Sequence, residues 1–287
     1  MPRTVASSGE TRLAVLGSPI YHSKSPALHR GAYAVLGLDW TYDAIDVTAQ
    51  NLAGFIESRD DSWRGLSLTM PLKREILPLL TWSDPVVGIV GAANTVLLDN
   101  GAVRGYNTDV YGVVQALRAA GVEKLGYVQI LGGGATAASV VAAAHELGAR
   151  RILVSVRTPA NAERLAVLGA ELGIDLTVRG FAVPSLESTD RSLGTPDAVI
   201  STLPGGVDPD VAFPADIREN SVLLDVAYEP WPSPLAAAWL EVGGTVVGGI
   251  EMLLHQALAQ VRIFVGGDAS LVLPGEAEVF AAMRATG

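Results

Sequence analysis

Three short polar clusters carry the residues best suited to chemistry. One is Gly65-Leu-Ser-Leu-Thr-Met-Pro-Leu-Lys73, in which a lone lysine follows a Thr-x-Pro turn, and the others are His22-Ser-Lys-Ser-Pro26 and Asn107-Thr-Asp109. A lysine ammonium can pass a proton to a reacting oxygen, and a carboxylate can hold that lysine in place. Together the clusters predict a site for a small polyhydroxylated anion.

A glycine-rich turn supplies a second chemical signal. The apolar run 127–131 predicts a strand, and it leads directly into Gly132-Gly-Gly-Ala-Thr-Ala-Ala138 and a predicted helix that reaches about residue 147. Gly132, Gly134 and Ala137 fit the G-x-G-x-x-A form, in which backbone N–H groups at a helix N-terminus meet a pyrophosphate. A tightly packed turn also needs glycine, and for the triplet alone this alternative stays open.

The end of the next predicted strand, Val154-Ser-Val-Arg-Thr158, indicates which dinucleotide is bound. An Asp or Glu here would accept the ribose hydroxyl of NAD, but this segment has no carboxylate. Arg157 can make paired charge-assisted hydrogen bonds to a 2′-phosphate, and Ser155 and Thr158 offer hydroxyls to the same group. The sequence therefore predicts NADP as cofactor; an ordinary solvated arginine is the alternative for residue 157.

The elements that must position these residues alternate between strand and helix, which is typical of an α/β protein. Strands are predicted at 12–16, 42–47, 66–69, 127–131, 152–156, 176–178, 198–201 and 222–226, and a hairpin at 91–98 and 103–106 around Asp99-Asn-Gly101. Helices are predicted at 26–36, 52–58, 74–80, 110–120, 135–147, 160–172, 252–265 and 276–285.

This order predicts two domains. The first is a mainly parallel α/β substrate domain, residues 1–109 completed by the C-terminal helices of 250–287, and the second is a Rossmann-type NADP-binding domain, residues 110–249. A chain of 287 residues is long enough for two hydrophobic cores.

Composition excludes several other classes of function. A net charge of −10 argues against nucleic acid or an anionic membrane as partner. The chain has no cysteine and its 4 histidines lack ligand spacing, so no disulfide and no metal site are expected. No apolar run is long enough to span a bilayer and residues 1–11 do not resemble a secretory signal, which by elimination predicts a cytoplasmic protein. The expected partner is the small-molecule substrate that the polar clusters predict. The sequence leaves open whether the protein forms a homodimer.

Ordered motifs along almost the whole chain resemble the shikimate dehydrogenase family. The matching segments are 18–26, 67–73, Gly91-Ala-Ala-Asn94-Thr95, Gly105-Tyr-Asn107-Thr-Asp109, the Gly132 turn, Ser201-Thr202-Leu-Pro204, Asp225-Val-Ala-Tyr228, and Gly248-Gly249-Ile-Glu-Met252 followed by Gln256. The resemblance implies reversible NADPH-dependent reduction of 3-dehydroshikimate to shikimate, a step toward aromatic amino acids.

The resemblance also assigns roles to residues. Lys73 and Asp109 would be the catalytic pair, and Ser23, Ser25 and Tyr228 would hold the substrate carboxylate. Further substrate contacts would come from Ser67, Thr69, Asn94 and Gln256, and cofactor contacts from Gly132, Gly133, Gly134, Ala135, Ser155, Arg157, Thr158, Thr202, Gly249 and Met252.

The chain departs from the family pattern at three positions. Ser67 stands where the family commonly has Asn, Ala135 where a third glycine is usual, and Val156 where Asn is frequent. The alternatives are a quinate/shikimate dehydrogenase or related cyclic-polyol oxidoreductase and, in a different class, a dinucleotide sensor without turnover. Ser23, Ser25 and Asp109 can also act as helix caps, and we expect His22 and His29 to be packing or surface residues.

Overall fold

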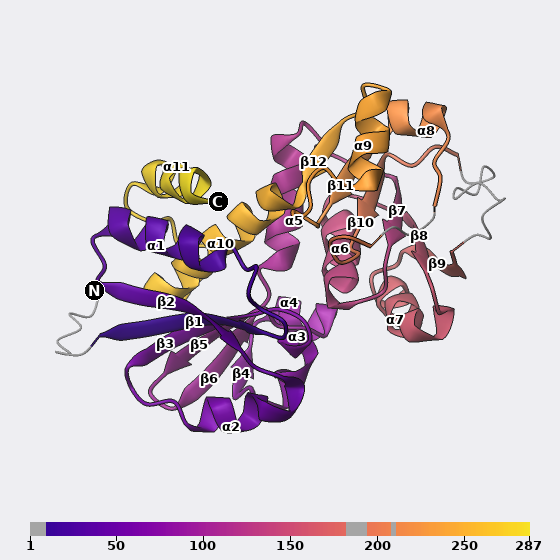
Figure 1. Ribbon diagram of the computed structural model, residues 1–287. Helices are drawn as coiled ribbons and strands as arrows, with labels where there is room; N and C mark the ends of the chain where they lie inside the picture. Colours follow the sequence, from indigo (N-terminus) through magenta and orange to yellow (C-terminus); the bar gives the residue numbers. More distant parts are fainter. Residues whose placement is uncertain (1–9, 182–193, 208–210) are drawn as a thin grey trace. The chain divides into compact units, whose positions relative to one another are not determined.

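The computed structural model describes residues 10–181, 194–207 and 211–287 (Figure 1). Backbone contacts divide the chain into two compact units. Unit 1 comprises Met1–Gly88, Ala92–Thr108 and Ala257–Gly287, and unit 2 comprises Ile89–Gly91 and Asp109–Gln256. The predicted boundaries of the functional domains, after residues 109 and 249, stay a prediction.

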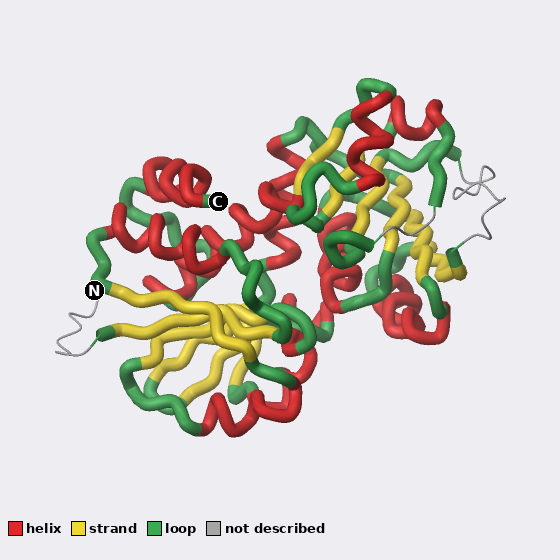
Figure 2. The backbone as a smooth tube through the Cα atoms, in the orientation of Figure 1, coloured by secondary structure: helices red, strands yellow, loops and turns green. Residues whose placement is uncertain are grey.

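Unit 1 contains a mixed six-stranded sheet in the order β2-β1-β3-β5-β6-β4, drawn as the lower group of yellow strands in Figure 2. Its strands are β1 (Thr11–Gly17), β2 (Trp40–Asp46), β3 (Trp63–Leu68), β4 (Trp82–Ser83), β5 (Thr95–Asp99) and β6 (Ala102–Tyr106). β1 is parallel to β2 and to β3, and β4 is parallel to β6. β5 is antiparallel to both of its neighbours.

The predicted hairpin is confirmed as β5 and β6. Its turn residues Asn100 and Gly101 have φ angles of 50° and 79°, the left-handed conformation that a tight two-residue turn requires. The first arm begins at Thr95 rather than at Gly91, because a helix that the sequence did not reveal, α4 (Pro85–Val90), ends just before that glycine.

The helices within unit 1 are α1 (Ser25–Leu36), α2 (Leu52–Glu57), α3 (Leu72–Glu75) and α11 (Glu276–Thr286), with short 3-10 turns at Ala49–Asn51 and Leu77–Leu79. Helix α11, from the C-terminal part of the chain, packs along α1, from its N-terminal part (Figure 1). α1 ends at Gly37, whose φ of 67° closes the helix. Leu16, Leu66 and Val96 belong to a fully apolar core with side chains of α2 and α3.

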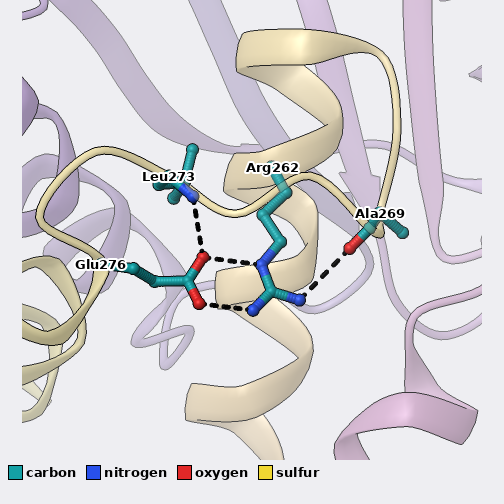
Figure 3. A network of polar contacts seen from close by, with 4 residues as sticks. All are labelled: Arg262, Ala269, Leu273 and Glu276. Carbon is teal, nitrogen blue, oxygen red and sulfur yellow. Dashed lines mark hydrogen bonds and ion pairs between the residues drawn. The ribbon is translucent and has the colours of Figure 1, made fainter.

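The C-terminal segment is held to unit 1 by an ion pair (Figure 3). Arg262, from the last part of α10 (Gly249–Gly266), donates from Nε to Oε2 of Glu276 at 2.9 Å and from Nη2 to Oε1 at 2.6 Å. The same carboxylate accepts the N–H of Leu273 at 3.0 Å, and Nη1 of Arg262 donates to the carbonyl of Ala269 at 3.2 Å. One bidentate pair therefore fixes the loop between α10 and α11.

Unit 2 is an open parallel sheet in the order β12-β11-β10-β7-β8-β9. Its strands are β7 (Tyr127–Leu131), β8 (Arg151–Val156), β9 (Asp175–Gly180), β10 (Ala198–Ser201), β11 (Val222–Asp225) and β12 (Val246–Gly248). The first strand of this unit, β7, lies in the middle of the sheet, with β8 and β9 on one side and β10, β11 and β12 on the other. This is the doubly wound arrangement of a Rossmann fold, as predicted. The central strands are buried on both faces, which explains why their sequences read as continuous apolar runs.

The helices of unit 2 are α5 (Asp109–Ala119), α6 (Ala135–Glu146), α7 (Glu163–Glu171), α8 (Ala215–Asn220) and α9 (Pro234–Glu241), with a 3-10 turn at Pro159–Ala162; α10 contributes its first part. Trp239 of α9 is fully buried against Leu131, Val199 and Leu223. Helices α8 and α9 and strand β12 were not predicted from the sequence. Within the described part of the chain, no helix combines the length and apolarity needed to cross a membrane.

Candidate active site

One edge of the sheet in unit 1 gathers most of the predicted substrate residues. β1, β3 and β6 run in the same direction, so their carboxyl ends meet at this edge, and the antiparallel strand β5 begins there. Hydrogen bonds tie the loops together: Ser18 N donates to Met70 O at 3.0 Å, and Leu68 N donates to Asn94 O at 2.7 Å. This edge is where open α/β sheets bind ligands.

Lys73 is anchored through its backbone. It is the second residue of α3, so the helix begins before it and not after it as the sequence had suggested. Its carbonyl accepts the N–H of Ala93 at 2.8 Å, and Leu72 N donates to Thr69 O at 2.8 Å. Thr69 in turn lies against Gly17, where an added Cβ would be 2.4 Å from the Thr69 methyl group. Because Gly17 has no side chain, the Thr-x-Pro turn can approach β1 closely.

The two serines of the first cluster lie where β1 leads into α1. Ser23 Oγ accepts the N–H of Ser25 at 3.3 Å, and Ser25 is 6% exposed. Helix α1 begins at Ser25 and its N-cap position is Lys24, which makes no side-chain cap bond. The interpretation of Ser25 as the helix cap is therefore wrong, because this residue already lies in the first turn.

Asn94 is buried and its carboxamide has a fixed orientation. Oδ1 accepts from Thr95 Oγ1 at 2.9 Å and from Thr108 N at 2.8 Å, and Nδ2 donates to Thr108 Oγ1 at 2.9 Å. Nearby, Asn107 Nδ2 donates to the carbonyl of Ala92 at 2.9 Å. The oxygen side of Asn94 is therefore occupied by protein donors.

Ser67 belongs to a buried hydrogen-bond network that was not predicted from the sequence. Its hydroxyl accepts from Tyr42 Oη at 2.6 Å and donates to Gln260 Oε1 at 2.8 Å. Gln260 Nε2 donates to Asn94 O at 3.2 Å and to Thr95 Oγ1 at 3.0 Å. The signal available in the sequence was a glutamine at a buried position of α10, between Ala259 and Val261.

His29 closes this network and confirms the expectation of a packing histidine. It is fully buried, its ring stacks on Tyr42 at 4.0 Å between centroids, and its nitrogens contact Tyr33 Oη at 3.1 Å and Gln260 Oε1 at 3.2 Å. Burial lowers the pKa of His29 to about 3, although the hydrogen bond to Gln260 acts in the opposite direction. The imidazole is therefore neutral at physiological pH.

The glycine turn of unit 2 leads directly into the N-terminus of α6. Gly132 has a φ of 109°, and an added Cβ would be 2.4 Å from Thr202 Oγ1, which itself donates to the carbonyl of Leu131 at 2.9 Å. Gly134 is the N-cap of α6, and a Cβ there would meet no atom within 4 Å. Gly133 packs towards Val156, and Ala135 opens the helix. The turn is open at the helix N-terminus, which favours an anion.

The residues that follow β8 differ in accessibility. Arg157 and Thr158 are exposed, whereas Ser155 is 3% exposed. The Ser155 hydroxyl accepts from Gln129 Nε2 and from Arg179 Nε, each at 3.5 Å. The predicted phosphate contact of Ser155 stays a prediction, and the burial of its hydroxyl argues against it.

The remaining predicted residues lie in unit 2. An added Cβ at Gly249 would be 2.1 Å from Val226 O, so this position accepts only glycine. Met252 and Gln256 are buried beside Gly112 of α5, and Gln256 Nε2 donates to the carbonyl of its own helix at Leu253, 3.0 Å away. Tyr228 follows β11 and is half-buried.

Asp109 is the first residue of α5 and is 4% exposed. A carboxylate here favours the helix through the positive end of its dipole. Lys73 belongs to unit 1 and Asp109 to unit 2, so their pairing stays a prediction. Among the described residues, no group of three His, Asp or Glu side chains is placed to hold a metal ion.

Comparison with known proteins gives consistent matches along the chain. Residues 15–96 match the family described as shikimate dehydrogenase substrate binding domain. A shikimate dehydrogenase (NADP⁺) of Ignicoccus hospitalis is 34% identical over 258 residues, which cover 89% of this chain and 93% of that protein.

Solved structures agree with the sequence matches. The crystal structure of Mycobacterium tuberculosis shikimate dehydrogenase has a TM-score of 0.81 at 34% identity and covers 96% of this chain and 99% of that one. Shikimate 5-dehydrogenase of Thermus thermophilus, solved in complex with NADP(H) and shikimate, has a TM-score of 0.78 at 30% identity and covers 96% of this chain and 100% of that one.

Proposed function

We propose that this chain, which belongs to the shikimate dehydrogenase family, catalyses the reversible NADPH-dependent reduction of 3-dehydroshikimate to shikimate. The observation that carries the proposal is the sheet edge of unit 1, where hydroxyls, a carboxamide and the Lys73 segment meet. These groups match a small ring that bears a carboxylate, hydroxyls and one reducible carbonyl. The NADP-linked relatives support both the substrate and the cofactor.

The residues of unit 2 fit a dinucleotide with a phosphorylated ribose. Gly132 allows close approach of the backbone, Gly134 is open at the start of α6, and Arg157 is an exposed cation at the end of β8. When bound, NADPH supplies a hydride to the carbonyl carbon. We assign the 2′-phosphate to Arg157 and Thr158, and further cofactor contacts to Thr202, Gly249 and Met252.

Lys73 is the proposed proton donor. Reduction of a carbonyl builds negative charge on its oxygen, and an ammonium group at that oxygen stabilises the charge and then transfers a proton. General acid catalysis of this kind is worth about 10²- to 10⁴-fold in rate. We assign Asp109 the role of orienting Lys73 and accepting a hydrogen bond from a substrate hydroxyl.

The other substrate contacts follow from the donors available. We assign the carboxylate to Ser23 and Ser25, with Tyr228, because hydroxyls donate to an anion without introducing a further charge. Thr69 and Gln256 are assigned to ring hydroxyls. Asn94 would use Nδ2, since its Oδ1 already accepts from two protein donors.

The test is an absorbance assay that follows NADPH. Purified protein receives shikimate or quinate with NADP⁺ or NAD⁺, and 3-dehydroshikimate with NADPH for the reverse reaction. We expect the highest kcat/KM with shikimate and NADP⁺. Turnover of quinate but not of shikimate would contradict the substrate assignment, and preference for NAD⁺ would contradict the role of Arg157. A cytoplasmic location and a homodimer also stay proposals, testable by fractionation and light scattering.

A further inference from the structure

Gln260 connects the buried polar network to Asn94. We propose that Gln260 and Thr95 are positioning residues that fix the Asn94 carboxamide for substrate, and that Ser67 acts through Gln260 rather than on the substrate itself. This inference rests on the proposed function for its kinetic consequences, whereas the network is visible in unit 1 alone. It revises the role that family resemblance gave to Ser67.

The carboxamide of Gln260 is held at both ends. Oε1 accepts from Ser67 Oγ at 2.8 Å and is 3.2 Å from His29 Nε2. Nε2 uses its two hydrogens on Asn94 O at 3.2 Å and Thr95 Oγ1 at 3.0 Å. Gln260 is 2% exposed, so the side chain cannot relax towards water when a partner is lost.

Thr95 transmits this orientation to Asn94. Because Thr95 Oγ1 accepts from Gln260, its single hydrogen points to Asn94 Oδ1 at 2.9 Å. Thr108 N donates to the same oxygen at 2.8 Å. These donors exclude the flipped amide, in which a nitrogen would face them, and so decide which end of Asn94 carries hydrogens.

The hydroxyl of Ser67 is used within the protein. It has one hydrogen, which goes to Gln260 Oε1, and it accepts from Tyr42 Oη at 2.6 Å. Ser67 is 4% exposed. Where the family commonly has Asn, this chain has a short hydroxyl that reaches across to helix α10, and its donor is no longer available for a ring hydroxyl.

The kinetic experiment compares Thr95→Val, Thr95→Ser, Gln260→Leu and Ser67→Ala in the assay with shikimate and NADP⁺. Thr95→Val keeps the side-chain shape but removes the hydroxyl that links Gln260 to Asn94. We expect it and Gln260→Leu to lower kcat/KM for shikimate about 10- to 100-fold, because a small misplacement of a substrate contact is costly. KM for NADP⁺ should stay within about 2-fold, and Thr95→Ser should retain most activity.

A double-mutant cycle tests the role of Ser67. If Ser67 acts through Gln260, the double variant with Ser67→Ala and Gln260→Leu should have the kcat/KM of Gln260→Leu alone. If Ser67 contacts the substrate, the two losses should multiply, which would overturn this part of the proposal. Glu276→Ala serves as the stability control, since it loosens α10 at Arg262 without touching the network.

Side-chain amide NMR of ¹⁵N-asparagine-labelled protein separates failure of this inference from failure of the proposed function. The Asn94 signal, assigned with Asn94→Ala, is measured without substrate. We expect it to shift in Thr95→Val and Gln260→Leu and to stay in place in Glu276→Ala. An unchanged Asn94 signal in both network variants, or wild-type kcat/KM for shikimate in both, would overturn the positioning role.

Discussion

Removing the carboxylate of Glu276 should destabilise the fold without impairing catalysis. Glu276→Ala deletes the two charge-assisted hydrogen bonds from Arg262, at 2.9 and 2.6 Å, and the acceptor of Leu273 N at 3.0 Å. The side chains are 10% and 20% exposed, so the pair is mostly withdrawn from water. Breaking a fully buried pair costs about 3–5 kcal/mol, and at this exposure we expect about 2–4 kcal/mol of unfolding free energy.

The effect should depend on pH in a defined direction. The hydrogen bonds from Arg262 are the main cause that lowers the pKa of Glu276 below its ordinary value of 4.5. A carboxylate whose pKa is lower in the folded state adds stability above the unfolded pKa, and this stability is lost as pH falls through the folded pKa. The difference between Glu276→Ala and wild type should therefore be constant near neutrality and shrink on acidification.

Urea unfolding followed by tryptophan fluorescence measures this prediction. The matched control is Glu276→Gln, which keeps the shape and one acceptor oxygen but no charge, and should cost about half as much. The free-energy difference is taken from the shift in midpoint at an unchanged m-value. A midpoint within error of wild type at neutral pH, or a difference that persists undiminished in acid, would refute the reasoning.

Three further substitutions have defined outcomes. Lys73→Ala should lower kcat about 10²- to 10⁴-fold while KM for shikimate changes several-fold at most; a large rise in KM at normal kcat would instead make Lys73 a binding residue. Arg157→Ala should raise KM for NADPH roughly 10- to 100-fold and leave KM for NADH unchanged, and an unaltered preference between the cofactors would contradict the 2′-phosphate assignment. Gly249→Ala should cost about 1–3 kcal/mol or more in urea unfolding, because its Cβ would be 2.1 Å from Val226 O. The control is Gly54→Ala in α2, where an added Cβ would meet no atom within 4 Å. This substitution should stabilise the folded protein by about 0.5–1 kcal/mol.

Features with local causes were predictable from the sequence. The hairpin turn at Asn100 and Gly101 depends on two residues that tolerate positive φ, and the strand that enters the Gly132 turn is a buried apolar run. β10 was placed at Ala198–Ser201 as observed. In contrast, α8 and α9 were missed, because short helices have too few turns to show a clear periodicity.

For the candidate site as well, features that depend on neighbouring residues were predictable from the sequence, whereas contacts between distant residues were not. The motifs around Lys73 and Gly132 led to the predictions of a proton donor and a phosphate-binding turn, because such motifs consist of residue types and spacings within a few positions. The environment of Ser67 was not visible, since its hydroxyl partners are 25 and 193 positions away in the chain.

By itself, then, the sequence determined the alternation of strands and helices, the glycine turn, and the presence of an ammonium, hydroxyls and carboxamides suited to a polyol anion. The tertiary structure alone decided which of these groups have their hydrogen-bonding atoms occupied within the protein. Ser67 is committed to Gln260, the Ser155 hydroxyl is buried, and the Asn94 oxygen is occupied. The physical reason is that a hydroxyl has a single hydrogen to donate, and its partner is chosen by strands and helices that only folding brings together.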